Sequence, residues 1–482
     1  MFRLPPVVAL ILLAAEVMAM VPAEPVEIGH EPQYFVDDWL VDNRWGNRSS
    51  QNVVRAFHQP VKHAGNPLIA GRGGYVQVLR DPDGGIFRMW YQTHAYVPDE
   101  DGNTPRIPRY AVGYAESEDG LAWELPEIGL HEWPDGAGNI VWTGHDGRRA
   151  SSPHIIDVPD EARRGYRHVM SYTGMGGLHL VGSDDGIHWD PESVMRIAGF
   201  HSDTHNTIVW DERRQEFVLF CRAKERYADG GELRDTGRPR RVASLRSPEL
   251  WTDWLADRHP SMILIPDELD LARGTNFFYG MPVFRHAGIY WGALWPFRMN
   301  SDIMTELAFS RDGVNFERLP TRPLLIDLGA EGAWDGGMVF GGVGWVEVGD
   351  EWWLYYGGHD GPHGSADRTA GIGLTMIRRG GFVSLRGPDD GGVVVTRQIR
   401  WPGGDLVLNA DASDGEIAVR VSDGLRKPVE GYDYDDGEAF SGDSVAHTVR
   451  WGARSLDALA GEVIRLEIAL RGADLFSIQA AQ

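Results

Sequence analysis

Two short polar segments of the chain carry acidic and imidazole side chains that could perform acid–base chemistry. Asp203 and His205 share the segment HSDTHN, and Glu331 and Asp335 share the segment EGAWDGGM. Paired carboxyl groups suit the cleavage of a glycosidic bond, because one donates a proton to the leaving oxygen while the other activates water or attacks the anomeric carbon. We therefore predict Asp203, Asp335, Glu331 and His205 as catalytic side chains.

Polar and aromatic side chains at comparable places would form the binding surface. An aromatic ring presents a flat apolar face beside polar edges, which suits a sugar ring. The predicted substrate-binding residues are His154, His201, Asn206, Tyr75, Arg222, Asn276, Tyr279, Trp295, Trp334 and His359. We expect no cofactor, and the histidines leave open a structural cation near the site.

Each candidate also has an ordinary structural explanation. Asp203 and Asp335 could cap turns, and Glu331 could be a solvated loop charge. The histidines could be buried side chains with satisfied hydrogen bonds. A functional role becomes more plausible when several of these side chains are expected near one axis.

A repeat organises the middle of the chain and would bring these segments together. SEDGLAW (117–123), SDDGIHW (183–189), SPELW (247–251) and SRDGVNF (310–316) recur at spacings of 66, 64 and 63 residues. A nearly constant period is typical of repeat architectures, and each unit here reads as four short strands. One further unit follows, so we predict a five-bladed β-propeller whose inner strands begin at the site. Asp119, Asp185 and Asp312 should cap their own turns and have no catalytic role.

The domain organisation follows from changes in composition along the chain. Residues 1–23 read as a signal peptide, with an apolar run at 7–15 and cleavage after Ala19 or Ala23. We predict the propeller over residues 30–388, with residues 34–42 as a strand that closes the ring. Residues 389–482 contain alternating strands with Gly/Asp turns, which predict a small C-terminal β-sandwich. The fold class is therefore all-β.

Charge and cysteine content exclude several classes of protein. The net charge is −24 in a chain of 482 residues, which makes nucleic acid and anionic membranes poor partners. No later segment is apolar enough to span a membrane, so we expect an exported protein with an oligo- or polysaccharide partner. The lone Cys221 forbids an intrachain disulfide.

Three segments resemble exported bacterial proteins related to the five-bladed glycosidases, a superfamily that includes β-fructofuranosidases, arabinofuranosidases and xylosidases. They are YAVGYAESEDGLAWELP (110–126), residues 203–211 and WDGGMVFGGVGWVEVGDEWWLYYGG (334–358). The resemblance implies a glycosidase, and the C-terminal module is similar to the accessory domain of many members. In that superfamily three acidic residues come from the first three blades. Here residues 73–77 and 151–154 carry none, and Asp81 in Arg-Asp-Pro reads as a turn residue.

The function predicted from the sequence is that of a secreted glycoside hydrolase that removes a side-chain or terminal sugar. One alternative is a propeller that binds carbohydrate without catalysis, which the missing carboxylates favour. Another is a polysaccharide lyase with a base such as His205. A phosphorylase is disfavoured, because it would need a basic phosphate pocket and export would separate it from phosphate.

Overall fold

The chain forms two compact units that consist almost entirely of β-strands. The computed structural model describes residues 24–42, 50–82, 85–96, 108–200, 202–223, 240–256, 259–365 and 368–481. The larger unit comprises Tyr34–Val36 and Arg55–Ser384, and the smaller unit comprises the described residues of 24–33, 37–54 and 385–481. Within these ranges the only α-helix is α1 (Glu268–Ala272), so no described helix has the length and apolarity needed to cross a membrane. The predicted signal peptide lies outside the described residues.

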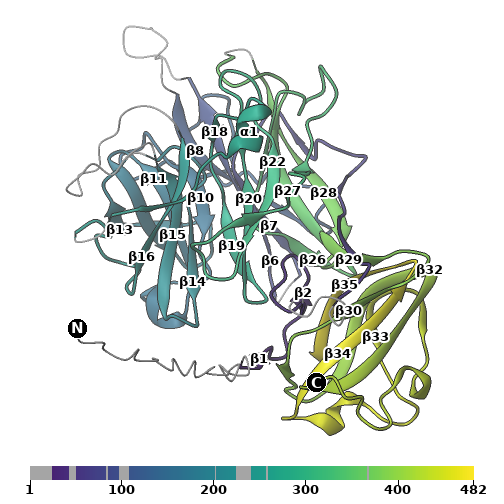
Figure 1. The fold of residues 1–482 in the computed structure, drawn as a ribbon. Helices are drawn as coiled ribbons and strands as arrows, with labels where there is room; N and C mark the ends of the chain where they lie inside the picture. Colours follow the sequence, from purple (N-terminus) through teal and green to yellow (C-terminus); the bar gives the residue numbers. More distant parts are fainter. Residues whose placement is uncertain are drawn as a thin grey trace, which may run out of the picture. The chain divides into compact units, whose positions relative to one another are not determined.

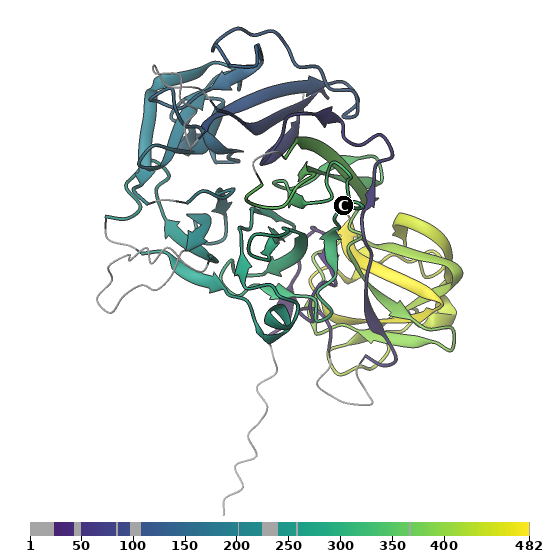
Figure 2. The same ribbon diagram turned by 90° about the horizontal axis from the view of Figure 1, so that it is seen from above.

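The larger unit is a five-bladed β-propeller, as the repeat predicts (Figure 1, Figure 2). In four blades, antiparallel strands follow one another along the chain from the axis outward. Blade 1 contains β6 (Val76–Arg80), β7 (Phe87–Ala95), β8 (Arg109–Ser117) and β9 (Ile140–Trp142), and blade 2 contains β10 (Ser151–Ile155), β11 (His168–Gly174), β12 (Gly177–Ser183) and β13 (Trp189–Ala198). Blade 3 contains β14 (Thr207–Asp211), β15 (Glu216–Ala223), β16 (Arg241–Ser247) and β17 (Ser261–Leu264). Blade 4 contains β19 (Val283–His286), β20 (Ile289–Leu294), β22 (Thr305–Ser310), β23 (Glu317–Arg318) and β24 (Leu324–Ile326).

Hydrogen bonds between inner strands join neighbouring blades around the axis. The Gln77 side chain donates to Ile155 O at 3.0 Å, and Ile155 N donates back to Gln77 Oε1 at 2.7 Å. Ile208 N donates to His154 Nδ1 at 3.1 Å, and Gln77 also forms a parallel bridge with Val343. The inner strands all begin at the same end of the axis, so the residues just before them meet there.

Blade 5 is closed by an early part of the chain, but not by the segment that the sequence suggested. Its strands are β25 (Met338–Gly341), β26 (Val346–Val348), β27 (Glu351–His359) and β28 (Ala370–Arg378), and β28 pairs with β4 (Val61–Lys62) and β5 (Ile69–Ala70). The prediction that residues 34–42 form the closing strand is wrong. Tyr34 instead packs against Trp291 and Trp352, with ring centroids 5.7 and 5.6 Å apart.

The inner strand of blade 5 is interrupted. Its two parts, β25 and β26, both pair with β27. Gly342 separates them, and a Cβ there would come within 2.6 Å of Val76 O in blade 1. The close approach of these two backbones therefore requires glycine at position 342. The inner strand of blade 5 is divided there into β25 and β26.

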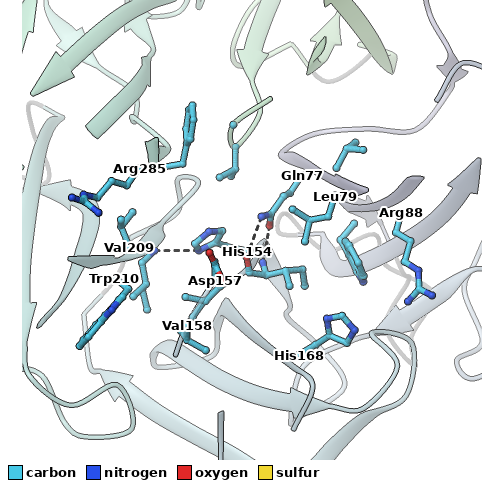
Figure 3. Close-up of a pocket in the computed structure, with 18 of the residues that line it drawn as sticks. Gln77, Leu79, Arg88, His154, Asp157, Val158, His168, Val209, Trp210 and Arg285 are labelled. Carbon is cyan, nitrogen blue, oxygen red and sulfur yellow. Dashed lines mark hydrogen bonds between the residues drawn. The ribbon is translucent and has the colours of Figure 1, made fainter. Parts of the chain in front are cut away.

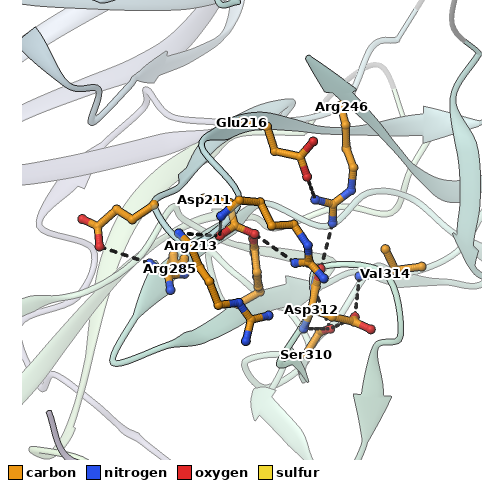
Figure 4. A network of polar contacts seen from close by, with 12 residues as sticks. Asp211, Arg213, Glu216, Arg246, Arg285, Ser310, Asp312 and Val314 are labelled. Atoms are coloured by element: carbon orange, nitrogen blue, oxygen red, sulfur yellow. Dashed lines mark hydrogen bonds and ion pairs between the residues drawn. The ribbon is translucent and has the colours of Figure 1, made fainter. Parts of the chain in front are cut away.

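The Ser-x-Asp-Gly turns are structural, as predicted. Asp312 Oδ1 accepts hydrogen bonds from Val314 N and Asn315 N at 2.8 Å each, and Gly313 adopts a φ of +70°. Asp119 and Asp185 accept the equivalent bonds in blades 1 and 2. Figure 4 shows that the turn around Asp312 also contacts blade 3, because Arg246 Nη2 donates to Asp312 O at 2.8 Å.

The C-terminal part of the chain folds as the predicted β-sandwich. Its longest strand, β32 (Asp405–Asp423), pairs with β35 (Ala473–Ala481) along its first half and with β34 (Val463–Arg471) along its second half. A register shift between Ala412 and Ile417 lets one strand serve both sheets, as at the corner of many sandwiches.

Candidate functional site

The propeller has a cavity at each end of its inner strands. The smaller, of about 110 Å³, lies where the inner strands begin and is called the mouth pocket below. It is lined by Gly73, Gly74, Tyr75, Gln92, His94, Tyr96, Pro108, Tyr110, Arg149, Ser151, Asp203, Tyr279, Met338, Phe340, His359, His363 and Arg368. The larger, of about 840 Å³, lies where the inner strands end and is called the exit cavity.

Charged side chains line the exit cavity as well, among them Arg88, Asp157 and Arg285 (Figure 3). Arg88 forms an ion pair with Asp81 at 3.2 Å, and Arg285 lies 3.7 Å from Glu212. His154 faces this cavity, and its Nδ1 accepts a hydrogen bond from the inner strand of blade 3. Burial lowers the pKa of His154 to about 3, so the ring is neutral. The exit cavity therefore has a mixed lining, in which arginines outnumber carboxylates and some of them form ion pairs.

Asp203 is presented to the mouth pocket by a buried arginine. Its Oδ1 accepts from Arg222 Nη1, and the Arg222 side chain is 3% exposed while that of Asp203 is 33% exposed. A carboxylate beside a buried guanidinium is stabilised in its ionised form. Asp203 is the one carboxylate among the described residues that line the mouth pocket.

Asn206 holds the segment that carries Asp203. Its buried amide donates to Ser202 O and Thr204 O at 3.0 Å each, and Ser202 Oγ donates to its Oδ1 at 2.5 Å. Arg222 N donates to Ser202 Oγ at 3.0 Å. The segment is thus tied both to itself and to β15, which sets the direction of the carboxylate.

Tyrosine rings form one wall of the mouth pocket. Tyr75 stacks on Trp295 and His205 with centroids 5.2 and 5.3 Å apart, and its hydroxyl donates to Asp203 O at 3.2 Å. The Arg240 guanidinium lies 4.1 Å from the centroid of Tyr279. Burial opposes ionisation of Tyr279, but Arg240, followed by Arg222, outweighs it and lowers its pKa, whereas burial raises the pKa of Tyr75.

Neutral imidazoles also line the mouth pocket. Burial lowers the pKa of His359 to about 3 and that of His363 to about 4, with Arg368 adding to both shifts. Burial also lowers the pKa of His94. The Nδ1 atoms of His359 and His363 are buried and have no hydrogen-bond partner in the described part of the chain. They are therefore free to contact a bound molecule.

The structure places the predicted site residues in several locations. Asp203, Tyr75, Tyr279 and His359 line the mouth pocket, with Arg222 directly behind Asp203. His205, Asn206 and Trp295 are buried beneath it, and His205 Nε2 contacts Pro153 O at 2.8 Å. His154 faces the exit cavity. Glu331 and Asn276 are exposed and line neither cavity, and His201 lies outside the described residues.

Asp335 and Trp334 lie within blade 5, outside the mouth pocket. Asp335 is 3% exposed, and its Oδ2 accepts from Lys62 Nζ at 2.6 Å and from the Tyr356 hydroxyl at 2.8 Å. The Trp334 ring packs on Tyr356 at a centroid distance of 5.5 Å. The structure thus does not bring Asp335 together with Asp203 in one cavity.

Three arginines at or beside the mouth pocket were not among the predicted site residues: Arg149, Arg240 and Arg368. Arg149 could have been found, because it stands just before the inner strand of blade 2. Arg240 and Arg368 instead precede the third strand of their blades, whereas the repeat directs attention to the beginnings of first strands and the ends of second strands. No group of three or more metal-binding side chains occurs among the described residues.

Comparison with known proteins finds only distant similarity. No protein-family profile matches the chain. Two uncharacterized proteins from two strains of Mycobacterium tuberculosis are each 29% identical over 147 residues, which cover 29% of this chain and 43% of theirs. The match therefore spans less than half the length of these curated relatives.

Glycoside hydrolases are among the solved structures that the chain resembles, as the sequence predicted. An N-acetylgalactosamine deacetylase from F. plautii is 17% identical, with a TM-score of 0.45 over 68% of this chain and 95% of its own. A thermostable family-43 glycoside hydrolase is 17% identical, with a TM-score of 0.41 over 69% and 96%. A glycosyl hydrolase from Bacteroides ovatus is 14% identical, with a TM-score of 0.41 over 67% and 96%. The five-bladed architecture itself stands on the strand pairing of this chain.

Proposed function

We propose that this protein is a glycoside hydrolase whose active site is the mouth pocket. The observation that carries the proposal is the partly exposed Asp203 carboxylate, held by buried Arg222 beside tyrosine rings and neutral imidazoles. A rigidly oriented carboxylate next to flat aromatic faces suits attack at a sugar's anomeric centre. The substrate is an oligo- or polysaccharide from which a terminal or side-chain sugar is removed.

Asp203 and Tyr279 take complementary roles in the proposed mechanism. Asp203, ionised beside Arg222, acts as the nucleophile or as the base that activates water. Tyr279 donates the proton to the leaving oxygen, because the Arg240 guanidinium stabilises the phenolate that remains. Asp335 has no part in this mechanism, since Lys62 and Tyr356 occupy its carboxylate inside blade 5.

The test is the release of reducing sugar from a panel of oligosaccharides and aryl glycosides. We expect Asp203→Asn to lower kcat by about 100-fold or more at temperatures where the variant is folded, and to lower Tm because buried Arg222 loses its charged partner. Asp81→Asn is the matched control, because Asp81 is also paired with an arginine but lies at the exit cavity. Full activity of Asp203→Asn would refute the proposal, and tight sugar binding without any product would favour the non-catalytic binding protein.

A polysaccharide lyase is a second candidate, favoured by the position of Arg240 over Tyr279. In a β-elimination a base removes the proton next to a uronate carboxylate while a cation neutralises that carboxylate. Tyr279 replaces His205 as the proposed base, because His205 is fully buried and its Nε2 contacts Pro153 O. An unsaturated, ultraviolet-absorbing product would decide for the lyase, and a saturated reducing sugar would decide for the hydrolase.

We also propose that the protein is exported, on the basis of the sequence pattern in residues 1–23. N-terminal sequencing of the protein recovered from the periplasm or the medium tests this. A mature chain that begins at Met20 or Glu24 would agree with cleavage after Ala19 or Ala23, whereas an unprocessed chain confined to the cytoplasm would contradict it.

A further inference from the structure

The mouth pocket is positively charged although the protein as a whole is strongly acidic. The chain has a net charge of −24, but Arg149 and Arg368 line the pocket, and Arg240 and Arg222 stand directly behind Tyr279 and Asp203. The only lining carboxylate that the structure describes, Asp203, is already paired with Arg222. Distant surface charges are screened beyond about 8 Å at physiological salt, so a bound group experiences mainly these local cations.

Three of these arginines, Arg149, Arg240 and Arg368, have a buried donor atom that makes no hydrogen bond in the described part of the chain. Arg240 Nη1 and Arg368 Nε are buried, and neither makes a hydrogen bond within the described residues. The Arg240 guanidinium rests on the rings of Tyr279 and Phe297, at 4.1 and 5.6 Å from their centroids. Arg368 Nη1 donates to Ser365 O at 3.0 Å, which fixes the side chain without neutralising it. Neither arginine forms an ion pair in the described part of the chain.

His363 contacts the same two aromatic rings as Arg240. Its ring is 5.3 Å from that of Tyr279 and 4.9 Å from that of Phe297, and both Arg240 and Arg368 add to the effect of burial in lowering its pKa. Its Nδ1 is buried without a partner among the described residues. A buried polar atom without a partner loses its hydrogen bonds to water. At or beside the mouth pocket the described residues with such atoms include Arg149, Arg240, Arg368, His359 and His363, and a ligand or water there would complete them.

We propose that the mouth pocket recognises an acidic sugar, whose carboxylate or sulfate oxyanion binds between Arg240 and Arg368 with His363 as a third contact. Guanidinium groups match the geometry of such oxyanions and bind them with charge-assisted hydrogen bonds. This substrate class rests on the proposed function of the pocket as a carbohydrate site, and it does not depend on which bond is cleaved.

The test is direct calorimetric binding with matched ligands and variants. The ligands are a uronate oligosaccharide, a sulfated oligosaccharide, the neutral oligosaccharide of the same length, and inorganic phosphate alone. We expect at least one acidic oligosaccharide to bind on the order of tenfold more tightly than the neutral one, with affinity that falls as salt is added. Arg368→Gln and Arg240→Gln should each remove this preference.

Controls separate recognition of the anion from general damage to the fold. Arg285→Gln at the exit cavity removes an arginine of the same propeller and should leave binding unchanged. Arg368→Lys keeps the charge and should restore part of the preference, which a purely structural role would not predict. Circular dichroism and Tm confirm that each variant is folded.

Three outcomes would overturn the proposal: equal binding of acidic and neutral sugars, unchanged acidic-sugar binding in both glutamine variants, or phosphate binding as tightly as the acidic sugar. The last would indicate a site for a free anion. Measuring how the Asp203→Asn variant binds the acidic and neutral oligosaccharides separates the proposal about substrate class from the proposal about hydrolysis. Normal turnover by Asp203→Asn would refute the mechanism while leaving the acidic-sugar preference intact.

Discussion

Asp203 owes its position at the mouth pocket to side chains that do not reach the pocket themselves. Asn206 closes the turn below it, Ser202 connects that turn to β15, and Arg222 holds the carboxylate. The sequence predicted that the segment around Asp203 contributes to a functional site, because several polar residues stand together just before an apolar strand. It did not indicate which of them would face inward, since that depends on hydrogen bonds to Thr173 and β15 from elsewhere in the chain.

The buried histidines beneath the pocket predict how stability depends on pH. Burial lowers the pKa of His205 to about 4 and that of His154 to about 3, from an ordinary value of 6.5. The unfolded chain therefore binds more protons than the folded chain between these values, so stability is complete above about pH 6.5 and falls as the pH drops toward 4. Each histidine contributes up to about 1.4 kcal/mol per pH unit in this window.

Urea unfolding at several pH values measures this dependence. His205→Gln should flatten the fall in the free energy of unfolding below pH 6.5. A slope that His205→Gln leaves unchanged would contradict the prediction.

At the scale of elements, the ion pair between Asp335 and Lys62 connects the closing strand β4 to blade 5. Its two residues are 273 positions apart in sequence, and the Asp335 carboxylate is almost fully buried. We expect Asp335→Asn to lower the free energy of unfolding by about 1–3 kcal/mol and to leave kcat unchanged at temperatures where the protein is folded.

A double-mutant cycle with Lys62→Met measures the coupling directly. The two changes should cost less together than the sum of their separate costs, because each removes the same contact. If Asp335→Asn instead abolishes turnover in a fully stable protein, Asp335 is catalytic after all, as the sequence first suggested.

The strand pattern was largely predictable because its determinants are local. Each Ser-x-Asp-Gly turn makes its own hydrogen bonds, and the run of apolar residues before it forms a strand whatever its neighbours are. Closure by β4 and β5 was not predictable, since two-residue strands show no alternating pattern. There the Asn66 amide pairs with the backbone of Leu374 in place of a longer strand, donating to its O and accepting from its N at 2.9 Å each.

The mouth pocket was only partly predictable for a related reason. Tyr75, Asp203 and Tyr279 precede inner strands or stand near their beginnings, which the repeat locates. Arg240 and Arg368 come from connections between the second and third strands. The repeat gives no reason to expect that residues just before a third strand lie at the mouth pocket.

At the scale of the whole molecule, the single cysteine gives a probe of how tightly the blades hold together. Cys221 lies in the apolar layer with Leu219, Leu245 and Trp254, and burial raises the pKa of its thiol to about 12. Both factors suppress formation of the reactive thiolate. We expect the native protein to resist a thiol reagent at pH 8 and one thiol to react per chain in urea.

The labelling rate in increasing urea should follow the loss of structure measured by circular dichroism. Complete labelling within seconds in native buffer would show that the blades around Cys221 separate freely, contrary to the packing described. Cys221→Ser supplies the blank for the measurement.

Closure of blade 5 by β4 and β5 has a consequence for synthesis of the protein. Residues 61–70 leave the ribosome early, yet their partner β28 is complete only when Arg378 has been added. Until then the ring is an open arc with an unpaired edge, which is the kind of surface on which other chains can pair. A ribosome-bound chain of this protein should therefore depend on chaperones until the fifth blade has been made.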